Sequence, residues 1–335
     1  MIAAEDLGTL LDIPGFRLGH AGNREGKTGV TVVLAEDGAA GAAEARGSAT
    51  GTRQFDSLVS AHHPAPGVHA LVFAGGSAYG LSAADGVVEE LARRRIGLGG
   101  RHGVIPLVPT AILFDLAFGD PRARPDAGLA LRALEAADTG AVDVGSVGVG
   151  TGATVGKIRG VEHATKGGFG FSALRGESGF TVAAAVGVNA FGDVRDPESG
   201  TLLAGVRRSP ESPELADSRR LLAGLSPEVT HPWESPAPEG NTTLAAVLTD
   251  ADLSKTLLLK VCQMAFGGLY RTLAPALTLY DGDLVATLAS RRVPAHPHAV
   301  GVLAEEAVSR AIVRAIRSAD GFGIVPAHRD LHPGG

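Results

Sequence analysis

Apolar residues along this chain gather in short runs that glycines and prolines separate, a pattern typical of buried strands. The runs predict strands over residues 28–35, 68–74, 181–190, 243–247 and 284–289. Helical spacing begins after Gly75-Gly76, where the apolar positions from Leu81 onward fall on one face until the arginines at 93–95. The same spacing predicts helices over residues 252–273 and 302–316.

This alternation of strands and helices places the chain in the α/β or α+β class, but periodicity does not give the order of the strands. A length of 335 residues allows one large domain or two smaller ones. Residues 206–240 break the pattern, since six of the 19 prolines lie there among charged residues. We therefore expect 206–240 to be a surface loop or linker, with a short helix over residues 214–222.

Composition narrows the class of protein. Hydrophobic residues make up 44% of the chain, yet aromatic residues are only 4% and glycines number 47, which indicates a core of Ala, Val and Leu with many tight turns. A net charge of −6 and a pI near 6.0 argue against binding to nucleic acid. Cys262 is the sole cysteine, so no intrachain disulfide can form. We find no signal-peptide pattern and no membrane-spanning run, and we expect a soluble cytoplasmic protein.

The segment Gly240-Asn241-Thr242-Thr243 carries the most informative chemistry, because it places a hydroxyl between the proline-rich region and a predicted strand. A threonine hydroxyl is a weak nucleophile unless a base lies beside it. An N-terminal threonine supplies that base as its own α-amine, whose reference pKa is about 7.7–8. This interpretation requires cleavage of the backbone between Asn241 and Thr242. By itself the motif also fits an ordinary turn followed by a strand.

Two further patterns place polar groups at the ends of predicted strands. Asp281 and Asp283 flank Gly282, so in an extended segment both carboxylates project from one face and perturb each other's pKa. The same three residues also suit a solvated hairpin. Asn189 ends an apolar strand, where its amide can donate a hydrogen bond to an oxyanion or begin a turn.

Tyr79 and Lys157 are weaker candidates. Tyr79 lies at a predicted strand-to-helix turn, a place from which a loop residue can point into a site. A surface or core aromatic and a solvated lysine are the competing interpretations. The glycine-rich segments near these two residues lack the spacing of nucleotide-binding loops, and the histidines at 62, 63 and 69 have no carboxylate at ligand spacing. We therefore expect neither a cofactor nor a metal.

Taken together, the chain resembles the self-cleaving hydrolase family that includes L-aminopeptidase/D-esterases, β-peptidyl aminopeptidases and the nylon-oligomer (6-aminohexanoate oligomer) endohydrolases. The resemblance runs from about Gly15 to about Asp320. It rests on six segments that occur in the family's order: Thr28-Gly29-Val30-Thr31-Val32, Gly75-Gly76-Ser77-Ala78-Tyr79-Gly80-Leu81, Gly156-Lys157, Val188-Asn189-Ala190-Phe191-Gly192-Asp193, Gly240-Asn241-Thr242-Thr243 and Asp281-Gly282-Asp283.

The resemblance implies both a fold and roles for the candidate residues. The implied fold has four layers, α-β-β-α, with two central sheets covered by helices. Thr242 would be the nucleophile, and Asn189 would donate to the oxyanion. The pair Asp281 and Asp283 would orient Thr242 and assist proton transfer, as the same pattern does in the nylon-oligomer hydrolases. The family's aminopeptidases carry a serine in place of the first acid. Lys157 and Tyr79 match family positions at the site; a lysine there would neutralise developing charge or hold a substrate carboxylate.

The sequence thus predicts one self-processing hydrolase domain over residues 1–335. Cleavage would give an associated pair of chains, 1–241 and 242–335, acting on short peptides, amino acid amides or 6-aminohexanoate oligomers, and the resemblance implies homotetramers. Two alternatives remain open at this stage. An acyltransferase of the ornithine-acetyltransferase type would pass the acyl group from the same threonine to an amine. A non-catalytic protein would only bind small molecules on this scaffold.

Overall fold

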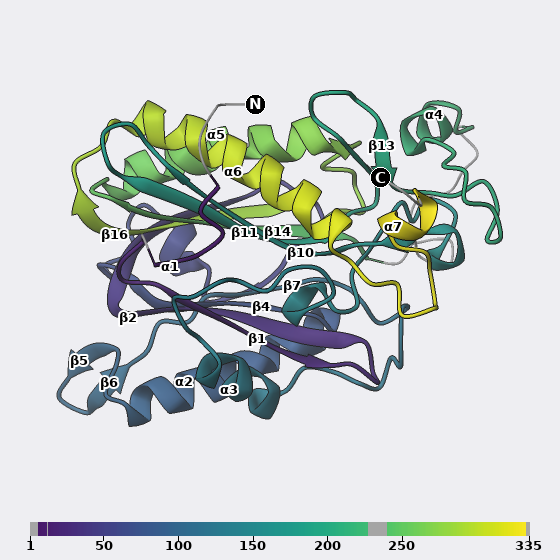
Figure 1. The fold of residues 1–335 in the computed structure, drawn as a ribbon. Helices are drawn as coiled ribbons and strands as arrows, with labels where there is room; N and C mark the ends of the chain where they lie inside the picture. The colour runs from purple at the N-terminus through teal and green to yellow at the C-terminus, as the bar shows by residue number, and fades with distance from the viewer. Residues whose placement is uncertain (1–5, 12, 227–239, 333–335) are drawn as a thin grey trace.

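A long hydrogen-bonded sheet forms the framework of the molecule (Figure 1). The computed structural model describes residues 6–11, 13–226 and 240–332. Eight strands lie in the following order across the sheet: β10 (Gly168–Arg175), β11 (Thr181–Asn189), β14 (Thr242–Ala251), β16 (Leu284–Val293), β2 (Thr28–Ala45), β4 (Val68–Ala74), β7 (Thr110–Ile112) and β3 (Gly51–Arg53). Strand β1 (Arg17–Asn23) pairs with β2 beside this path. The β14–β16 and β4–β7 pairs are parallel.

Strand β2 joins the two halves of this sheet. Its first half pairs with β1 and β4, its second half pairs with β16, and the register shifts between Leu34 and Ala39. The predicted strand 28–35 therefore continues to Ala45, through the glycine at 38 that the sequence suggested as a turn. A shift of this kind bends a strand. As a result, the two expected central sheets are two layers of one sheet, linked through β2.

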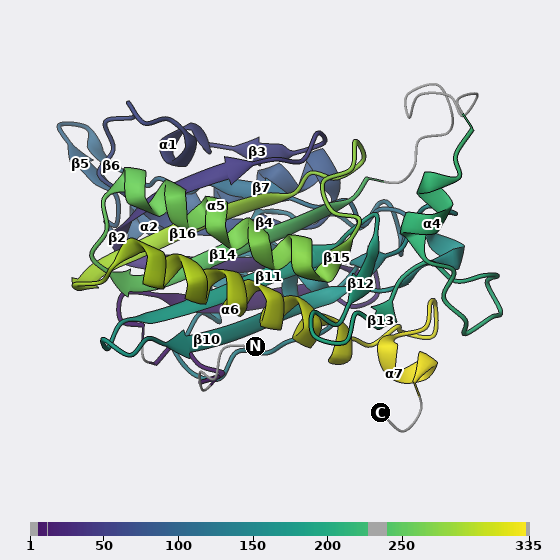
Figure 2. The ribbon, with the colours of Figure 1, turned by 90° about the horizontal axis from the view of Figure 1, so that it is seen from above.

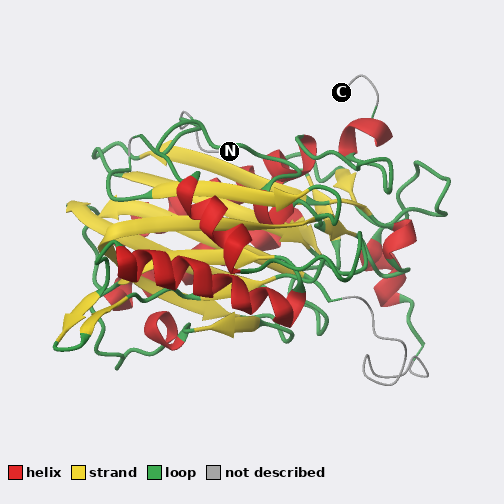
Figure 3. Ribbon diagram, turned by 90° about the horizontal axis from the view of Figure 1, so that it is seen from below, coloured by secondary structure: helices red, strands yellow, loops and turns green. Residues whose placement is uncertain are grey.

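Three apolar clusters separate four layers, as expected. Helices α5 (Lys255–Thr272) and α6 (Pro297–Arg317) pack on β10, β11 and β16 through a cluster that includes Val247 and Phe266 (Figure 2). A second cluster, with Phe73 and Phe169, fills the space between the two sheet layers. A third, with Val87, lies between β1, β2, β4 and the helices α2 (Ala84–Arg93) and α3 (Ala127–Glu135) on the opposite side (Figures 1 and 3).

The helices begin and end where local signals allow. The expected helix from residue 81 is a 3₁₀ turn, η1 (Ser77–Ala83), followed by α2. Helix α5 starts after Ser254, whose side chain accepts a hydrogen bond from the N–H of Leu257. Helix α6 begins at Pro297, five residues before the predicted start, because proline is well suited to the first turn. The expected helix 214–222 is α4 (Ser218–Ala223).

The proline-rich region is only partly described. Residues 206–217 form irregular backbone with one bridge between Arg207 and Leu215, whereas residues 227–239 lie outside the described part of the chain. Shorter elements complete the fold: α1 (Asp56–Val59), β5 (Leu98–Gly100), β6 (Gly103–Ile105), η2 (Gly148–Gly150), β8 (Thr154–Val155), η3 (Val161–His163), β9 (Thr165–Lys166), β12 (Asp193–Arg195), β13 (Leu202–Ala204), β15 (Leu273–Ala274) and α7 (His328–Leu331). None of the helices in the described ranges has the length and apolarity to span a bilayer.

Candidate active site

Three neighbouring strands bring most of the predicted site residues to one place. Strands β11 and β14 pair so that Asn189 lies opposite Thr242. The parallel β14–β16 ladder begins at Leu244 and Leu284, and a bridge in the same register joins Asn241 to Asp281. Each of the site residues on these strands is at most 3% exposed: Asn189, Asn241, Thr242, Asp281 and Asp283. Residues more than fifty positions apart in the sequence therefore form one buried cluster.

The carbonyl oxygen of Asn241 lies at the centre of this cluster. The Thr242 hydroxyl donates a hydrogen bond to it, which places Oγ1 against the peptide bond that would be cleaved. The backbone N–H of Gly282 donates to the same oxygen at 2.8 Å. A Cβ added at Gly282 would lie 2.7 Å from Thr242 Oγ1, so a side chain at this position would collide with the Thr242 hydroxyl. One carbonyl is thus held between a hydroxyl and a backbone N–H.

The two aspartates accept hydrogen bonds from the backbone of β14 and from the loops beside it. Asp283 accepts hydrogen bonds from the N–H of Thr243 at 2.6 Å and from the N–H of Leu277 at 3.1 Å. Asp281 accepts from the N–H of Phe191 at 3.0 Å, and its other oxygen accepts from Thr278. The Asp-Gly-Asp segment is not a solvated hairpin, because both side chains are buried and residues 46–49 donate to its carbonyl oxygens.

Burial changes the protonation of both carboxyl groups. Removal from water, and to a smaller extent the nearby charge of Asp281, raise the pKa of Asp283 to about 8. The pKa of Asp281 is also raised by burial, against the effect of hydrogen bonds from Thr278 and Phe191 and of the Lys157 charge. Because like charges oppose each other's ionisation, the two carboxyl groups titrate as a pair.

Lys157 and Asn189 form a second part of the cluster. Lys157 Nζ donates to Asn189 Oδ1 at 2.7 Å and to the backbone oxygens of Asn189 and Thr154. Since a lysine only donates, this contact fixes which end of the Asn189 amide is the oxygen. Asn189 Nδ2 consequently faces the other way, and donates to the carbonyls of Phe114 at 2.9 Å and Gly240 at 3.4 Å. The Asn189 amide thus reaches the carbonyl one residue before that of Asn241.

Tyr79 is placed differently from the other candidates. Its side chain is 53% exposed, and the Arg124 guanidinium lies over its ring at 3.3 Å from the centroid. It sits two residues after Ser77, whose N–H donates to the carbonyl of Leu113, next to Phe114. The structure therefore places Tyr79 in η1, outside the buried cluster, and pairs its ring with Arg124.

Three residues that contact the Gly240–Asn241 segment had no signal in the sequence. Gly282 acts through its backbone N–H and Tyr280 through its carbonyl, which accepts from the Asn241 N–H at 3.3 Å. Phe114 packs against Gly240 so closely that an added Cβ there would lie 2.9 Å from it. Backbone groups leave no mark on the pattern of residue types, and a single phenylalanine after a short strand is indistinguishable from a core residue.

A second cluster of buried charged side chains, Lys166 and Asp115, lies next to the Thr242 cluster. Lys166 is fully buried and donates to the carbonyls of Gly150, Ala153 and Gly167. Burial lowers its pKa to about 7, while the charge of Asp115 opposes that change. Asp115 accepts from Thr28 Oγ1 and the Gly76 N–H, each at 2.7 Å, and burial raises its pKa to about 6.

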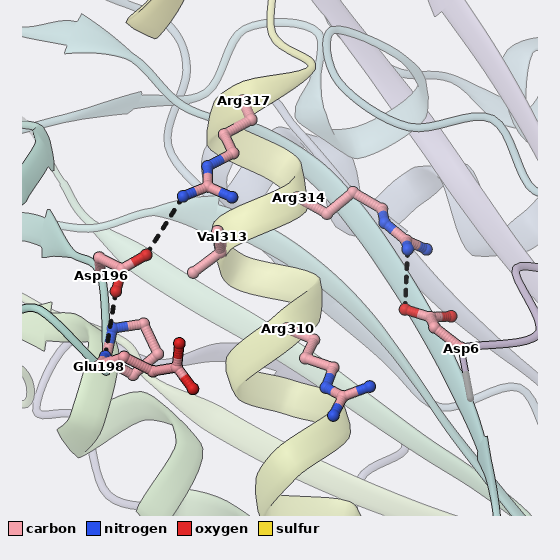
Figure 4. Close-up of a pocket in the computed structure, with 8 residues that line it drawn as sticks. Asp6, Asp196, Glu198, Arg310, Val313, Arg314 and Arg317 are labelled. Carbon is pink, nitrogen blue, oxygen red and sulfur yellow. Dashed lines mark hydrogen bonds and ion pairs between the residues drawn. The ribbon is translucent and has the colours of Figure 1, made fainter. Parts of the chain in front are cut away.

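The surface also carries a cavity of about 390 Å³ along one face of α6 (Figure 4). Arg314 points to Asp6 at 2.8 Å, Arg317 points to Asp196 at 3.2 Å, and Arg310 pairs with Glu306. Each of these arginines is engaged with a carboxylate, and none of the predicted site residues lines this cavity. Among the described residues, no group of three His, Cys, Asp or Glu side chains is arranged to hold a metal ion.

Comparisons with known proteins identify the family of the chain. The sequence profile of peptidase family S58 matches residues 8–326. An uncharacterized aminopeptidase of Mycobacterium leprae (strain TN) is 36% identical over 369 aligned positions, covering 100% of this chain and 97% of the relative. A 6-aminohexanoate-oligomer endohydrolase of Paenarthrobacter ureafaciens is 31% identical over 284 positions, covering 81% of this chain and 72% of the relative.

Solved structures share the fold at low sequence identity. A β-aminopeptidase of Burkholderia sp. superposes with a TM-score of 0.68 at 20% identity, over 98% of this chain and 92% of that one. The L-aminopeptidase D-Ala-esterase/amidase of Ochrobactrum anthropi, described as a new variant of the Ntn hydrolase fold, superposes with a TM-score of 0.70 at 16% identity, over 95% and 88%. The mixed α/β architecture is therefore that of these hydrolases.

Proposed function

Because the chain belongs to peptidase family S58 and is a hydrolase of amide or peptide bonds, we propose that Thr242 is its nucleophile and that self-cleavage after Asn241 makes it active. One observation carries this proposal: the Thr242 hydroxyl and the Gly282 N–H both donate to the carbonyl oxygen of Asn241. A nucleophile beside a carbonyl, with a donor already on the carbonyl oxygen, is what addition to that carbonyl requires.

Self-cleavage would proceed through an ester. Thr242 Oγ1 attacks the carbonyl carbon of Asn241, its proton passes to the Thr242 nitrogen, and the C–N bond breaks. Water then hydrolyses the ester, leaving a carboxylate on Asn241 and a free amine on Thr242. The new chains stay together because β14, from the second chain, is hydrogen-bonded to β11 from the first. Asp283 would position Thr242 through the Thr243 N–H, and the two aspartates would assist transfer of the proton from Oγ1 to the nitrogen.

Turnover would use the same hydroxyl with a new base. The free α-amine of Thr242 accepts the Oγ1 proton during attack on a substrate amide and returns it to the leaving amine. Water hydrolyses the resulting acyl-enzyme. Relatives named as aminopeptidases and 6-aminohexanoate-oligomer endohydrolases support short peptides, amino acid amides or 6-aminohexanoate oligomers as substrates. The paired aspartates favour the oligomer-hydrolase end of this range.

Intact-mass measurement tests the proposal. The wild-type protein of 33.9 kDa should yield chains of about 24 and 9.5 kDa, in proportion to residues 1–241 and 242–335, the smaller one beginning with Thr242. Thr242→Ala should remain uncut, and Thr242→Ser should still cleave. Thr249→Ala, a buried threonine on the same strand whose hydroxyl bonds to the carbonyl of Thr181, is the matched control and should cleave normally. Cleavage of Thr242→Ala at this bond would contradict the nucleophile.

A further inference from the structure

The uncut segment before Thr242 lies in the sheet as a substrate residue would. Asn241 extends the β14–β16 ladder beyond its first pair and bridges Asp281 in parallel register. Its N–H donates to the Tyr280 carbonyl at 3.3 Å, and its carbonyl accepts from the Gly282 N–H at 2.8 Å. This is the hydrogen-bonding pattern of a residue in a parallel ladder. The backbone of residues 280–282 thus offers one acceptor and one donor to whatever residue stands before the reacting bond.

We propose that the acyl residue of a substrate takes the place of Asn241 after self-cleavage, as one added residue of the β14–β16 ladder. The proposal rests on the proposed function, because it assumes that the same Oγ1 attacks both bonds. The substrate carbonyl then accepts from the Gly282 N–H, and its amino group donates to the Tyr280 carbonyl. The added residue would continue the end of β14, which lies between β11 and β16, and backbone pairing of an extended segment with a strand is a recurrent mode of peptide recognition.

The position of the Tyr280 carbonyl is fixed by its surroundings. The Tyr280 ring stacks on Phe191, with the centroids 4.8 Å apart, and the Phe191 N–H donates to Asp281. The next peptide is held from the other side, because the Ala49 N–H donates to the Asp281 carbonyl at 2.9 Å. A ladder edge held on both sides needs little reorganisation when a new residue binds, which favours binding.

Phe114 limits the size of the residue that can precede the acyl residue in this subsite. In the uncut chain, Gly240 passes Phe114 without room for a side chain, since an added Cβ would lie 2.9 to 3.2 Å from three atoms of the phenylalanine. A substrate that extends beyond its acyl residue must follow the same path. Free amino acid amides and glycine-extended amides therefore fit, whereas a bulky residue before the acyl residue collides with Phe114. The inference makes Phe114 the residue that favours removal of single N-terminal units.

Four p-nitroanilides test the inference on the self-cleaved protein: Asn-p-nitroanilide, its analogue without the amino group (succinamoyl-p-nitroanilide), Gly-Asn-p-nitroanilide and Leu-Asn-p-nitroanilide. We expect kcat/KM to fall at least about tenfold when the amino group is removed, because the Tyr280 carbonyl loses its donor. We expect the leucine-extended anilide to react at least about tenfold more slowly than the glycine-extended one.

The variant Phe114→Ala should remove that discrimination. The ratio of kcat/KM between the glycine- and leucine-extended anilides should approach one, and because both values come from the same variant, a general change in activity cancels from this ratio. Phe322→Ala, a half-buried phenylalanine that contacts Arg24 and Lys27 instead, is the matched control and should keep the wild-type ratio.

The outcomes separate the two proposals. Release of p-nitroaniline from Asn-p-nitroanilide by the wild type, and not by Thr242→Ala, supports the proposed function whatever the ratios are. Turnover of that compound with equal rates for the two extended anilides, or an unchanged ratio in Phe114→Ala, overturns the subsite. Failure of all four compounds with a protein that has cleaved itself overturns the subsite and leaves the self-cleavage part of the proposed function in place.

Discussion

The Thr242 cluster and the Lys166 cluster have the same ingredients in different arrangements. Each buries a lysine together with at least one carboxyl group whose pKa is raised by removal from water. In the Thr242 cluster, Asp283 accepts a hydrogen bond from the Thr243 N–H. The neighbouring Thr242 hydroxyl donates to the carbonyl oxygen of Asn241. In the Lys166 cluster the lysine binds backbone carbonyls, and the carboxylate binds a backbone N–H and the hydroxyl of Thr28, so the polar groups of this cluster hold loops together.

The comparison separates two uses of the same chemistry. A perturbed pKa marks burial in both clusters, so by itself it does not identify a catalytic group. What distinguishes the Thr242 cluster is that three strands place a nucleophile, a carbonyl and a donor in contact. The two clusters also adjoin, since Lys157 binds the Thr154 carbonyl and Lys166 binds the carbonyl of Ala153. The predictions below test whether they act separately.

Substitution of the carboxyl groups should give the largest difference in self-cleavage rate between the two clusters. Asp283→Asn should slow self-cleavage at least about 100-fold, because the carboxylate that exchanges the proton is removed. With a pKa of about 8, ionised Asp283 increases as pH rises, so the wild-type cleavage rate should climb up to about pH 8 and this climb should vanish in the variant. Intact mass against time, from pH 6 to 9, measures both. Asp115→Asn is the matched carboxyl variant and should retain the wild-type pH profile.

Substitution of the lysines should give a smaller difference in self-cleavage rate between the two clusters. Lys157→Met leaves Asn189 Oδ1 without its charged donor, so the amide loses its fixed orientation, and cleavage should slow by roughly 10- to 100-fold. Lys166→Met should leave the rate within about threefold, since it removes support from loops only. The measurement is the half-time of fragment formation, with circular dichroism to show that both variants fold. Equal slowing in the two variants would mean that the clusters work as one unit.

Lys166→Met, which should change the cleavage rate least, should instead change how the free energy of unfolding depends on pH. The pKa of Lys166 is lowered on folding, from its usual value to about 7, so the unfolded chain binds more protons between pH 7 and about 10. The free energy of unfolding should therefore increase as pH rises through this window, and this increase should be absent below pH 7. Lys166→Met should lack this gain. Urea unfolding of the uncut Thr242→Ala protein, with and without Lys166→Met, measures the contribution; a parallel pH dependence in the two proteins would contradict it.

Asp283 contributes to stability with the opposite sign. Its pKa is raised on folding, so the folded chain binds more protons between about pH 4 and pH 8, and stability falls as pH rises through that window. Asp283 and Lys166 thus predict opposite slopes in adjoining pH ranges, so Asp283→Asn and Lys166→Met should each remove one of the two slopes.

Much of the fold followed from local pattern. The apolar runs predicted β4, β11, β14 and β16 within a few residues, because buried strands need continuous apolar side chains. The long β2 was predicted only to residue 35, since Glu36, Asp37 and Gly38 resemble a turn. Its continuation depends on pairing with β16, a partner almost 250 residues away. No local pattern carries information about such a pairing.

The candidate site, like the fold, was predicted from the sequence only in part. Residue types and order alone pointed to Thr242, Asn189, Lys157 and the two aspartates, and to membership of a hydrolase family, because that chemistry needs those side chains. Tertiary structure decided that Asn189 pairs with Thr242, that Tyr79 lies outside the buried cluster, and that the backbone of Tyr280 and Gly282 holds the Asn241 peptide. The reason is physical: every residue carries the same N–H and C=O, so their roles arise only when folding sets their direction and removes them from water.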